Sequence, residues 1–123
     1  MVLVDTSVWI RWFVDAMPLA DELDGLLDAD LVAGHELVYG ELLIGDCGGR
    51  KKFLATYREL HQASFIAHQE VVELAVARGL HGRGVGWIDV HLLAAAVAGR
   101  MQLWTVDPRF AAVAKDLGVA YEF

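Results

Sequence analysis

The chain has 123 residues, a formal net charge of −7 and a hydrophobic fraction of 56%. This length suits one domain and leaves too few residues for a second core, and so apolar a composition excludes intrinsic disorder. Charged residues interrupt every apolar stretch before it reaches the roughly 18 residues needed to cross a bilayer, so we expect a cytoplasmic protein that does not bind membranes. The single cysteine, Cys47, has no partner for an internal disulfide and is interpreted as structural.

Strands and helices are expected to alternate along the chain. Short apolar runs predict buried strands at residues 2–4, 31–33, 64–67, 103–106 and 119–121. Helical spacing and helix-forming composition predict helices after Asp5, around 19–27 and Glu41, and over about 53–60, 72–80, 88–99 and 108–117. This alternation predicts a single α/β domain over residues 1–123, built on a parallel, helix-covered sheet. Such sheets bind ligands at the carboxyl ends of their strands.

The charge is distributed unevenly. Residues 1–49 hold ten acidic residues and one basic residue, whereas residues 50–123 hold nine basic and seven acidic residues. Acidic side chains concentrated in one part of a chain either face solvent or surround a cation. The net negative charge also predicts weak nonspecific binding to RNA with a shallow salt dependence.

Four acidic residues stand where a site is expected. Asp5 follows the first predicted strand and Asp107 follows the fourth, so both carboxylates should lie at the carboxyl edge of the sheet. Asp89 falls in the first turn of a predicted helix. Each of these three is equally well explained as a helix cap or first-turn residue. Glu41 is not, because it interrupts an apolar helical stretch, where a lone carboxylate is costly.

If these carboxylates converge, repulsion of about 4 kcal/mol per close pair at an effective dielectric constant near 20 opposes folding unless a cation lies among them. Carboxylate oxygens select hard ions such as Mg²⁺ or Mn²⁺. A site of this kind hydrolyses phosphodiesters by activating water and stabilising charge on the phosphate oxygens.

Four motifs in order resemble those of PIN-domain ribonucleases, in the VapC-type branch of toxins from type II toxin–antitoxin pairs: VLVDTSVWI at 2–10, VYGELLIG at 38–45, GWIDVHLLAAA at 86–96 and LWTVDPRF at 103–110. The resemblance covers nearly the whole chain. It implies a three-layer fold with helices on both faces of a parallel sheet. It also implies Mg²⁺-dependent endoribonuclease activity, with Mn²⁺ as an alternative ion, together with a cognate antitoxin and a homodimer.

The resemblance also assigns roles to residues. The acidic quartet of the family maps to Asp5, Glu41, Asp89 and Asp107. Of these, Asp5 and Asp89 match the most direct metal ligands. Glu36 competes with Glu41 as the second acid, although VYGELLIG keeps more of the apolar frame of the branch around Glu41.

Further side chains are candidates for contact with substrate. The hydroxyls beside the first and last acids belong to Thr6, Ser7 and Thr105. Arg83, in a glycine-rich loop before Asp89, can reach a phosphate or belong to a turn. The run from Arg50 to Lys52 is interpreted as a solvated helix start that can also touch RNA phosphates. His91 lies about 200° around the helix from Asp89, which favours a packing or supporting role over metal ligation.

Two other functions remain open from the sequence. A Mg²⁺-binding phosphoacceptor domain has a similar size and fold, but it needs an aspartate after its third strand and a lysine after its last. Here His68 and Gln69 follow the predicted third strand, and no lysine follows the final one. A catalytically silent PIN-like interaction module is the other alternative.

Overall fold

Four short parallel strands form the sheet in the computed structural model, which describes residues 1–45 and 50–123. Cys47 therefore lies outside the described residues. The strands occur in the spatial order β3-β2-β1-β4 and are β1 (Val2–Val4), β2 (Val32–Gly34), β3 (His61–Gln62) and β4 (Gln102–Trp104). Val2 is paired with Val32 on one side and Gln102 on the other, so β1 is a central strand.

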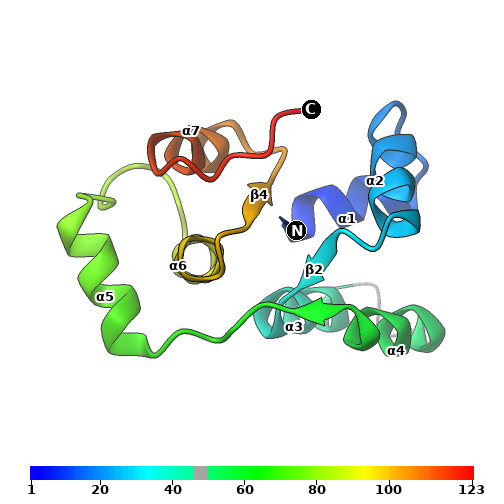
Figure 1. Cartoon of the computed structure of the whole chain (residues 1–123), viewed down its shortest axis with the longest axis horizontal. Coiled ribbons are helices and arrows are strands. Elements are labelled where there is room, and N and C mark those ends of the chain that lie inside the picture. The colour runs from blue at the N-terminus through cyan, green and yellow to red at the C-terminus, as the bar shows by residue number, and fades with distance from the viewer. Residues whose placement is uncertain (46–49) are drawn as a thin grey trace.

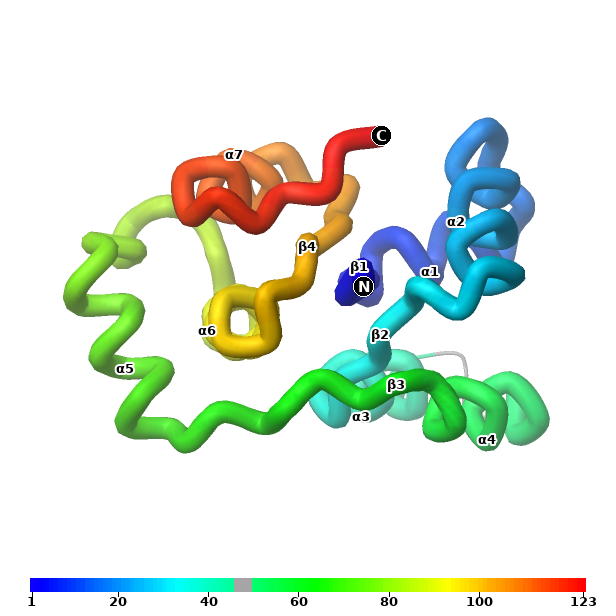
Figure 2. The backbone as a smooth tube through the Cα atoms, in the orientation of Figure 1, coloured from blue at the N-terminus to red at the C-terminus, as the bar shows by residue number. Residues whose placement is uncertain are grey.

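Seven helices surround this sheet in the described part of the chain: α1 (Thr6–Phe13), α2 (Leu19–Asp28), α3 (Glu36–Ile44), α4 (Lys51–Glu59), α5 (His68–Ala77), α6 (Trp87–Gly99) and α7 (Pro108–Asp116). Helices α1 and α2 lie on one side of the sheet and α5 and α6 on the other, while α3 and α4 lie beside β2 and β3 (Figure 1). The tube view shows α7 beyond β4 (Figure 2). The predicted three-layer α/β fold is therefore confirmed. None of these helices is long and apolar enough to span a membrane.

The apolar composition is explained by layers buried on both sides. The three residues of β1 are buried on both faces, as expected for a central parallel strand. Helix α6 is buried continuously from Val90 to Ala96, because the sheet and α5 cover it from different directions. On the α1 side, the Trp9 ring packs edge-on against Trp12 and Tyr57 at centroid distances of 5.4 and 5.7 Å. These contacts fix the helices that follow the strands.

One predicted strand is wrong, and another is reduced to a single bridge. No strand covers residues 64–67; the third strand is the exposed pair His61–Gln62, and Phe65 is 50% exposed. Over 119–121 only Ala120 forms an isolated bridge, with Leu103. Around this bridge the Leu103 N–H donates to the Val119 carbonyl and the Tyr121 N–H to the Leu103 carbonyl, so this segment still hydrogen-bonds to β4. The helix predicted over 72–80 runs from His68 to Ala77 and ends before Gly79, which has a positive φ of 60°.

Candidate active site

Asp5 is the buried centre of the site at the end of β1. Its side chain is only 6% exposed and caps α1. Its Oδ2 accepts hydrogen bonds from Ser7 Oγ at 2.7 Å, Thr105 Oγ1 at 2.9 Å and the Ser7 N–H at 3.4 Å. The N–H groups of Val106 and Asp107 donate to these two hydroxyl oxygens, so the hydroxyl protons point toward Asp5. Among the described residues no donor reaches Oδ1, which leaves it available to a ligand.

Glu41 is joined to the same helix by a hydroxyl. Thr6 Oγ1 donates to Glu41 Oε1 at 2.7 Å, and this bond connects the start of α1 to α3. The Glu41 side chain is half-buried, whereas Glu36 is exposed in the first turn of α3 and makes no such contact with α1 in the described structure. The geometry thus favours Glu41 as the second acid.

Asp89 lies in the first turn of α6 and is held by one backbone bond, from the Gly86 N–H to its Oδ2 at 2.9 Å. Burial raises the pKa of Asp89 above its usual range, although the Gly86 hydrogen bond opposes this shift. The negative charges of Asp5, Glu41 and Asp107 raise the pKa of Asp89 further. Asp5, Glu41 and Asp107 therefore all lie within electrostatic reach of Asp89, although the four acids come from four different parts of the chain.

Asp107 is exposed and caps α7. Its Oδ1 accepts from the N–H groups of Arg109 and Phe110 at 2.9 and 3.3 Å, and Pro108 occupies the first helical position. The capping interpretation is therefore correct for Asp5 and for Asp107. It is also incomplete, because capping does not account for the electrostatic coupling of both residues to Asp89.

The side chains expected to contact substrate have partners inside the protein. The hydroxyls of Thr6, Ser7 and Thr105 donate to Glu41 or Asp5. Arg83 forms an ion pair with Asp116 at 2.8 Å, near the end of α7. These contacts orient the acidic side chains and the loop before α6.

Arg109 is a cation that the sequence did not single out. Its side chain lies against Gly84, in the loop before α6, and a Cβ at position 84 would lie 2.4 Å from Arg109 Cδ. Gly84 also has a φ of +81°, which disfavours other residues. The loop and the start of α7 therefore require a glycine at position 84, and no pattern in the sequence identifies its partner.

The sequence also did not single out a buried polar pair, His35 and Tyr57, of which Tyr57 lies close enough to Asp5 to feel its charge. His35 is fully buried. Its imidazole Nδ1 accepts a hydrogen bond from the Leu37 N–H at 3.0 Å, and its backbone N–H donates to Tyr57 Oη at 2.9 Å. Burial, followed by the charge of His91, lowers the pKa of His35 to about 4, so the imidazole is neutral near pH 7. Burial raises the pKa of Tyr57, and the charge of Asp5 adds to that shift. His91 is itself buried and packs against Phe65 and Trp87, which supports its predicted packing role.

The donor set suits a hard divalent cation. Within residues 1–45 and 50–123, no group of three or more histidine, cysteine, aspartate or glutamate side chains is arranged to hold a metal ion. Mg²⁺ does not need such a group, because it is usually bound by one or two carboxylates and keeps several waters. Asp5 Oδ1 and the Asp89 carboxylate are the candidate oxygen ligands, and negative charges near Asp89 are of the sign that attracts a cation.

Comparison with known proteins decides the family. The family model described as "PIN domain" matches residues 2–116. The chain belongs to the PIN-domain family. This PIN domain is similar to Ribonuclease VapC32 of Mycobacterium tuberculosis, strains CDC 1551 / Oshkosh and H37Rv, with 40% identity over 122 residues, covering 98% of the chain and 95% of each relative. Membership excludes the phosphoacceptor interpretation.

A solved structure agrees with this fold. The crystal structure of PAE2754 from Pyrobaculum aerophilum aligns with a TM-score of 0.61 at 20% identity and covers 98% of this PIN domain and 87% of that chain. At this level of identity the likeness shows the shared fold alone. The α/β architecture predicted from the sequence is that of the family.

Proposed function

We propose that this PIN domain is a Mg²⁺-dependent endoribonuclease that hydrolyses phosphodiester bonds of cellular RNA, as the toxin of a type II toxin–antitoxin pair. The observation that carries the proposal is the gathering of Asp5, Glu41, Asp89 and Asp107 at one edge of the sheet, where three of these charges act on the fourth. The similarity to Ribonuclease VapC32 over nearly the whole chain supports the same activity.

Asp5 and Asp89 would hold the ion through their carboxylate oxygens, and Mn²⁺ has the same preference for oxygen ligands. When bound, Mg²⁺ activates water and neutralises charge on the scissile phosphate. Ser7 and Thr105 fix Asp5 Oδ2 and thereby orient Oδ1. Glu41, oriented by Thr6, and Asp107 add negative charge that favours cation binding and can accept a proton from the attacking water.

Incubation of the purified chain with total RNA tests this proposal. We expect cleavage in Mg²⁺ or Mn²⁺ and none in a chelator. The products should carry 5′-phosphate and 3′-hydroxyl ends, because water attacks the phosphorus and the RNA 2′-hydroxyl is not used. Full activity in chelator, or 2′,3′-cyclic phosphate ends, would falsify the metal mechanism. No cleavage under any condition would favour a catalytically silent module.

We propose two protein partners, a cognate antitoxin and a second copy of the chain. Large apolar side chains are exposed on and just after α1, where Ile10, Val14 and Met17 are 55%, 73% and 61% accessible. Apolar groups grouped in this way commonly mark protein interfaces. Sedimentation of the purified chain at several concentrations tests the homodimer, and a monomer at all of them contradicts it.

A further inference from the structure

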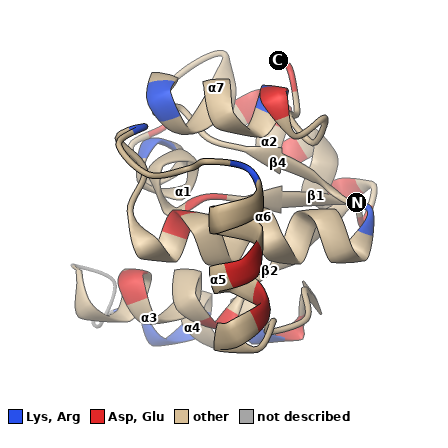
Figure 3. Cartoon of the chain, turned by 90° about the vertical axis from the view of Figure 1, so that its left-hand side faces the viewer, with Lys and Arg blue, Asp and Glu red and all other residues tan. Residues whose placement is uncertain are grey.

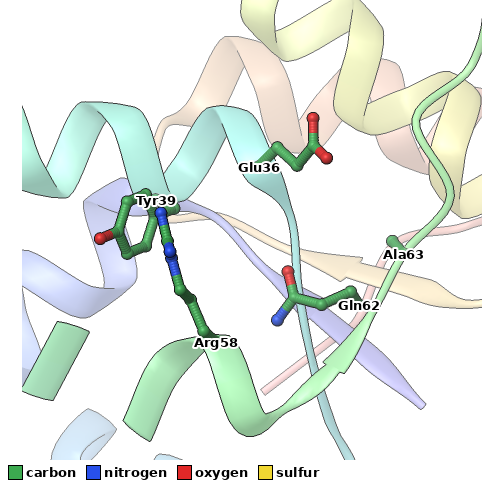
Figure 4. Close-up of a pocket in the computed structure, with 5 residues that line it drawn as sticks. All are labelled: Glu36, Tyr39, Arg58, Gln62 and Ala63. Carbon is green, nitrogen blue, oxygen red and sulfur yellow. The ribbon is translucent and has the colours of Figure 1, made fainter. Parts of the chain in front are cut away.

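A pocket lined by both polar and apolar atoms lies at the ends of β2 and β3. It has a volume of about 440 Å³ and is lined by Glu36, Tyr39, Arg58, Gln62 and Ala63, which come from α3, α4 and the end of β3 (Figure 4). This size falls within the usual range for small-ligand sites. Only β2 lies between β3 and β1 in the parallel sheet, so the pocket and Asp5 lie at the carboxyl ends of strands in the same part of the sheet.

Opposite charges line this pocket without neutralising each other. In the described part of the chain, neither the Glu36 carboxylate nor the Arg58 guanidinium belongs to an ion pair. The Arg58 guanidinium instead stacks on the Tyr39 ring, 4.2 Å from its centroid. Figure 4 shows Arg58 lying across Tyr39, with Glu36 and Gln62 on the other side of the pocket. A flat cationic surface therefore faces two polar side chains.

Hydrogen bonds within the protein fix the direction of the Gln62 amide. Its Nε2 donates to the carbonyl oxygens of Tyr57 and Leu60 at 3.0 and 3.1 Å, which uses both N–H groups. Gly34 permits this arrangement, since a Cβ there would lie 2.7 Å from Gln62 Nε2. No donor among the described residues reaches Gln62 Oε1, so this oxygen and the Glu36 carboxylate offer only acceptors.

We propose that this pocket binds an unpaired guanine base of the RNA substrate, with its N1–H and amino group donating to Glu36 and its ring stacked on Arg58. The inference rests on the proposed function, because it takes RNA as the substrate. Guanine alone among the four bases carries two adjacent donors on its Watson–Crick edge. Uracil has one N–H between two carbonyls, and adenine and cytosine place a ring acceptor beside their amino group. Gln62 Oε1 is available to the second amino hydrogen.

The distribution of positive charge favours RNA over a protein partner. An arginine side chain also offers only donors, but Arg58 in the pocket wall repels a second guanidinium. Helix α4 and its N-cap carry one acidic residue, Glu59, and four basic residues, Arg50, Lys51, Lys52 and Arg58. The whole chain, in contrast, has a net charge of −7. Figure 3 shows this basic segment on the ribbon of α4. Phosphates next to a bound base would lie close to these cations.

Binding of single nucleotides tests the pocket without requiring catalysis. We expect GMP, titrated into the full chain in chelator and followed by NMR, to shift resonances of Tyr39 and Gln62 and to bind about tenfold more tightly than AMP, CMP or UMP. Glu36→Gln should abolish this preference, while Glu73→Gln on the exposed face of α5 makes the same charge change and should keep it. Equal binding of all four nucleotides overturns the proposal. Tighter binding of arginine amide at the same residues also overturns it and assigns the pocket to a protein partner.

Cleavage mapping separates this inference from the proposed function. We expect wild-type products from a random-sequence RNA to show guanine at a fixed offset from the cut. Glu36→Gln should lower kcat/KM at those sites by about tenfold and lose the guanine signal, whereas Glu73→Gln should change neither. Cleavage without a guanine signal, or a signal that survives Glu36→Gln, refutes the pocket while leaving the nuclease proposal standing. If the wild type cleaves no RNA, the nuclease proposal fails and the GMP titration in chelator still decides what the pocket binds.

Discussion

Asp5 and Asp89, the two carboxylates proposed to hold the metal, are built in opposite ways. Asp5 is buried, and one of its oxygens accepts three hydrogen bonds, two from hydroxyls held in place by backbone N–H groups. Asp89 accepts one backbone hydrogen bond, and burial, followed by three neighbouring negative charges, raises its pKa. Hydrogen bonds of the fold therefore orient the Asp5 carboxylate without a metal ion. The Asp89 carboxylate, in contrast, is repelled by neighbouring carboxylates unless a cation is bound.

Loss of either the Asp5 or the Asp89 carboxylate should have the largest effect on RNA cleavage, because both are proposed to bind the metal ion. We expect Asp5→Asn and Asp89→Asn each to reduce RNA cleavage by about a thousandfold or more. Rates measured on one fluorescent RNA at saturating Mg²⁺ check this. Asp28→Asn, at the exposed end of α2, is the matched control and should retain full activity. Substantial activity in Asp5→Asn would contradict the assigned ligands.

A second expectation concerns the buried, neutral imidazole of His35. Because the pKa of His35 falls from 6.5 to about 4 on folding, its stabilising contribution is complete above pH 6.5 and is lost as the pH falls toward 4. This group alone should lower the free energy of unfolding by up to about 3 kcal/mol over that window. Urea unfolding at several pH values measures the slope. His35→Asn, which keeps a capping side chain, should flatten it.

The pKa of Asp89 is raised on folding, so its titration increases the free energy of unfolding as the pH falls, opposite to the effect of His35. The His35 comparison is therefore best made in an Asp89→Asn background. A slope between pH 6.5 and 4 that is unchanged by His35→Asn would show that the buried imidazole does not control acid stability.

The hydroxyls around Asp5 should have an intermediate effect. Ser7→Ala and Thr105→Val each remove a hydrogen bond to Oδ2 and leave Asp5 less well oriented, which should weaken Mg²⁺ affinity or activity by about 10- to 100-fold. Cleavage rates as a function of Mg²⁺ concentration measure both quantities. Thr56→Val removes an exposed hydroxyl on α4 that donates to the Lys52 carbonyl and should leave both unchanged. Similar losses in all three variants would argue against a specific role.

The smallest expected effect is on stability without metal. A raised pKa means that ionised Asp89 destabilises the fold at neutral pH, and this cost disappears as the pH falls through its folded value. Asp89→Asn should therefore gain on the order of 1 kcal/mol in chelator. Asp5→Asn, which replaces a well-bonded cap, should gain nothing.

Thermal melts with and without Mg²⁺ complete that comparison. The ion should stabilise the wild type by an amount that grows with the logarithm of its concentration above the dissociation constant, and should not stabilise Asp89→Asn. An equal gain in stability for Asp5→Asn and Asp89→Asn would contradict the inferred difference between the well-bonded Asp5 carboxylate and the repelled Asp89 carboxylate.

The sequence predicted the central elements better than the peripheral ones, for a physical reason. Central strands such as β1 and long buried helices such as α6 need apolar residues on several sides, and that demand is visible in composition. Edge strand β3 is two exposed polar residues and has no such pattern. The apolar run at 64–67 was assigned to a strand from its residue types, but Phe65 there is 50% exposed, and residue types alone do not show whether a segment is buried.

Similar limits apply to the site. The acids were visible because they follow strands or interrupt an apolar helix face. Some contacts of the site join segments that are distant in sequence. These are the hydrogen bonds of the Thr6 and Thr105 hydroxyls to Glu41 and Asp5 and the approach of Gln62 to Gly34. Spacing along the chain carries no information about such contacts.

The pairing of β1 with β4 has a consequence for synthesis of the chain. Leu3 lies opposite Leu103, and Asp5 receives a hydrogen bond from Thr105, so β1 must wait for a segment made 100 residues later. Until that segment is made, the Asp5 carboxylate has only its Ser7 donors, and Asp107 does not yet exist. The acidic edge is therefore completed only after α6 has been made, and a nascent chain carries no assembled site until then.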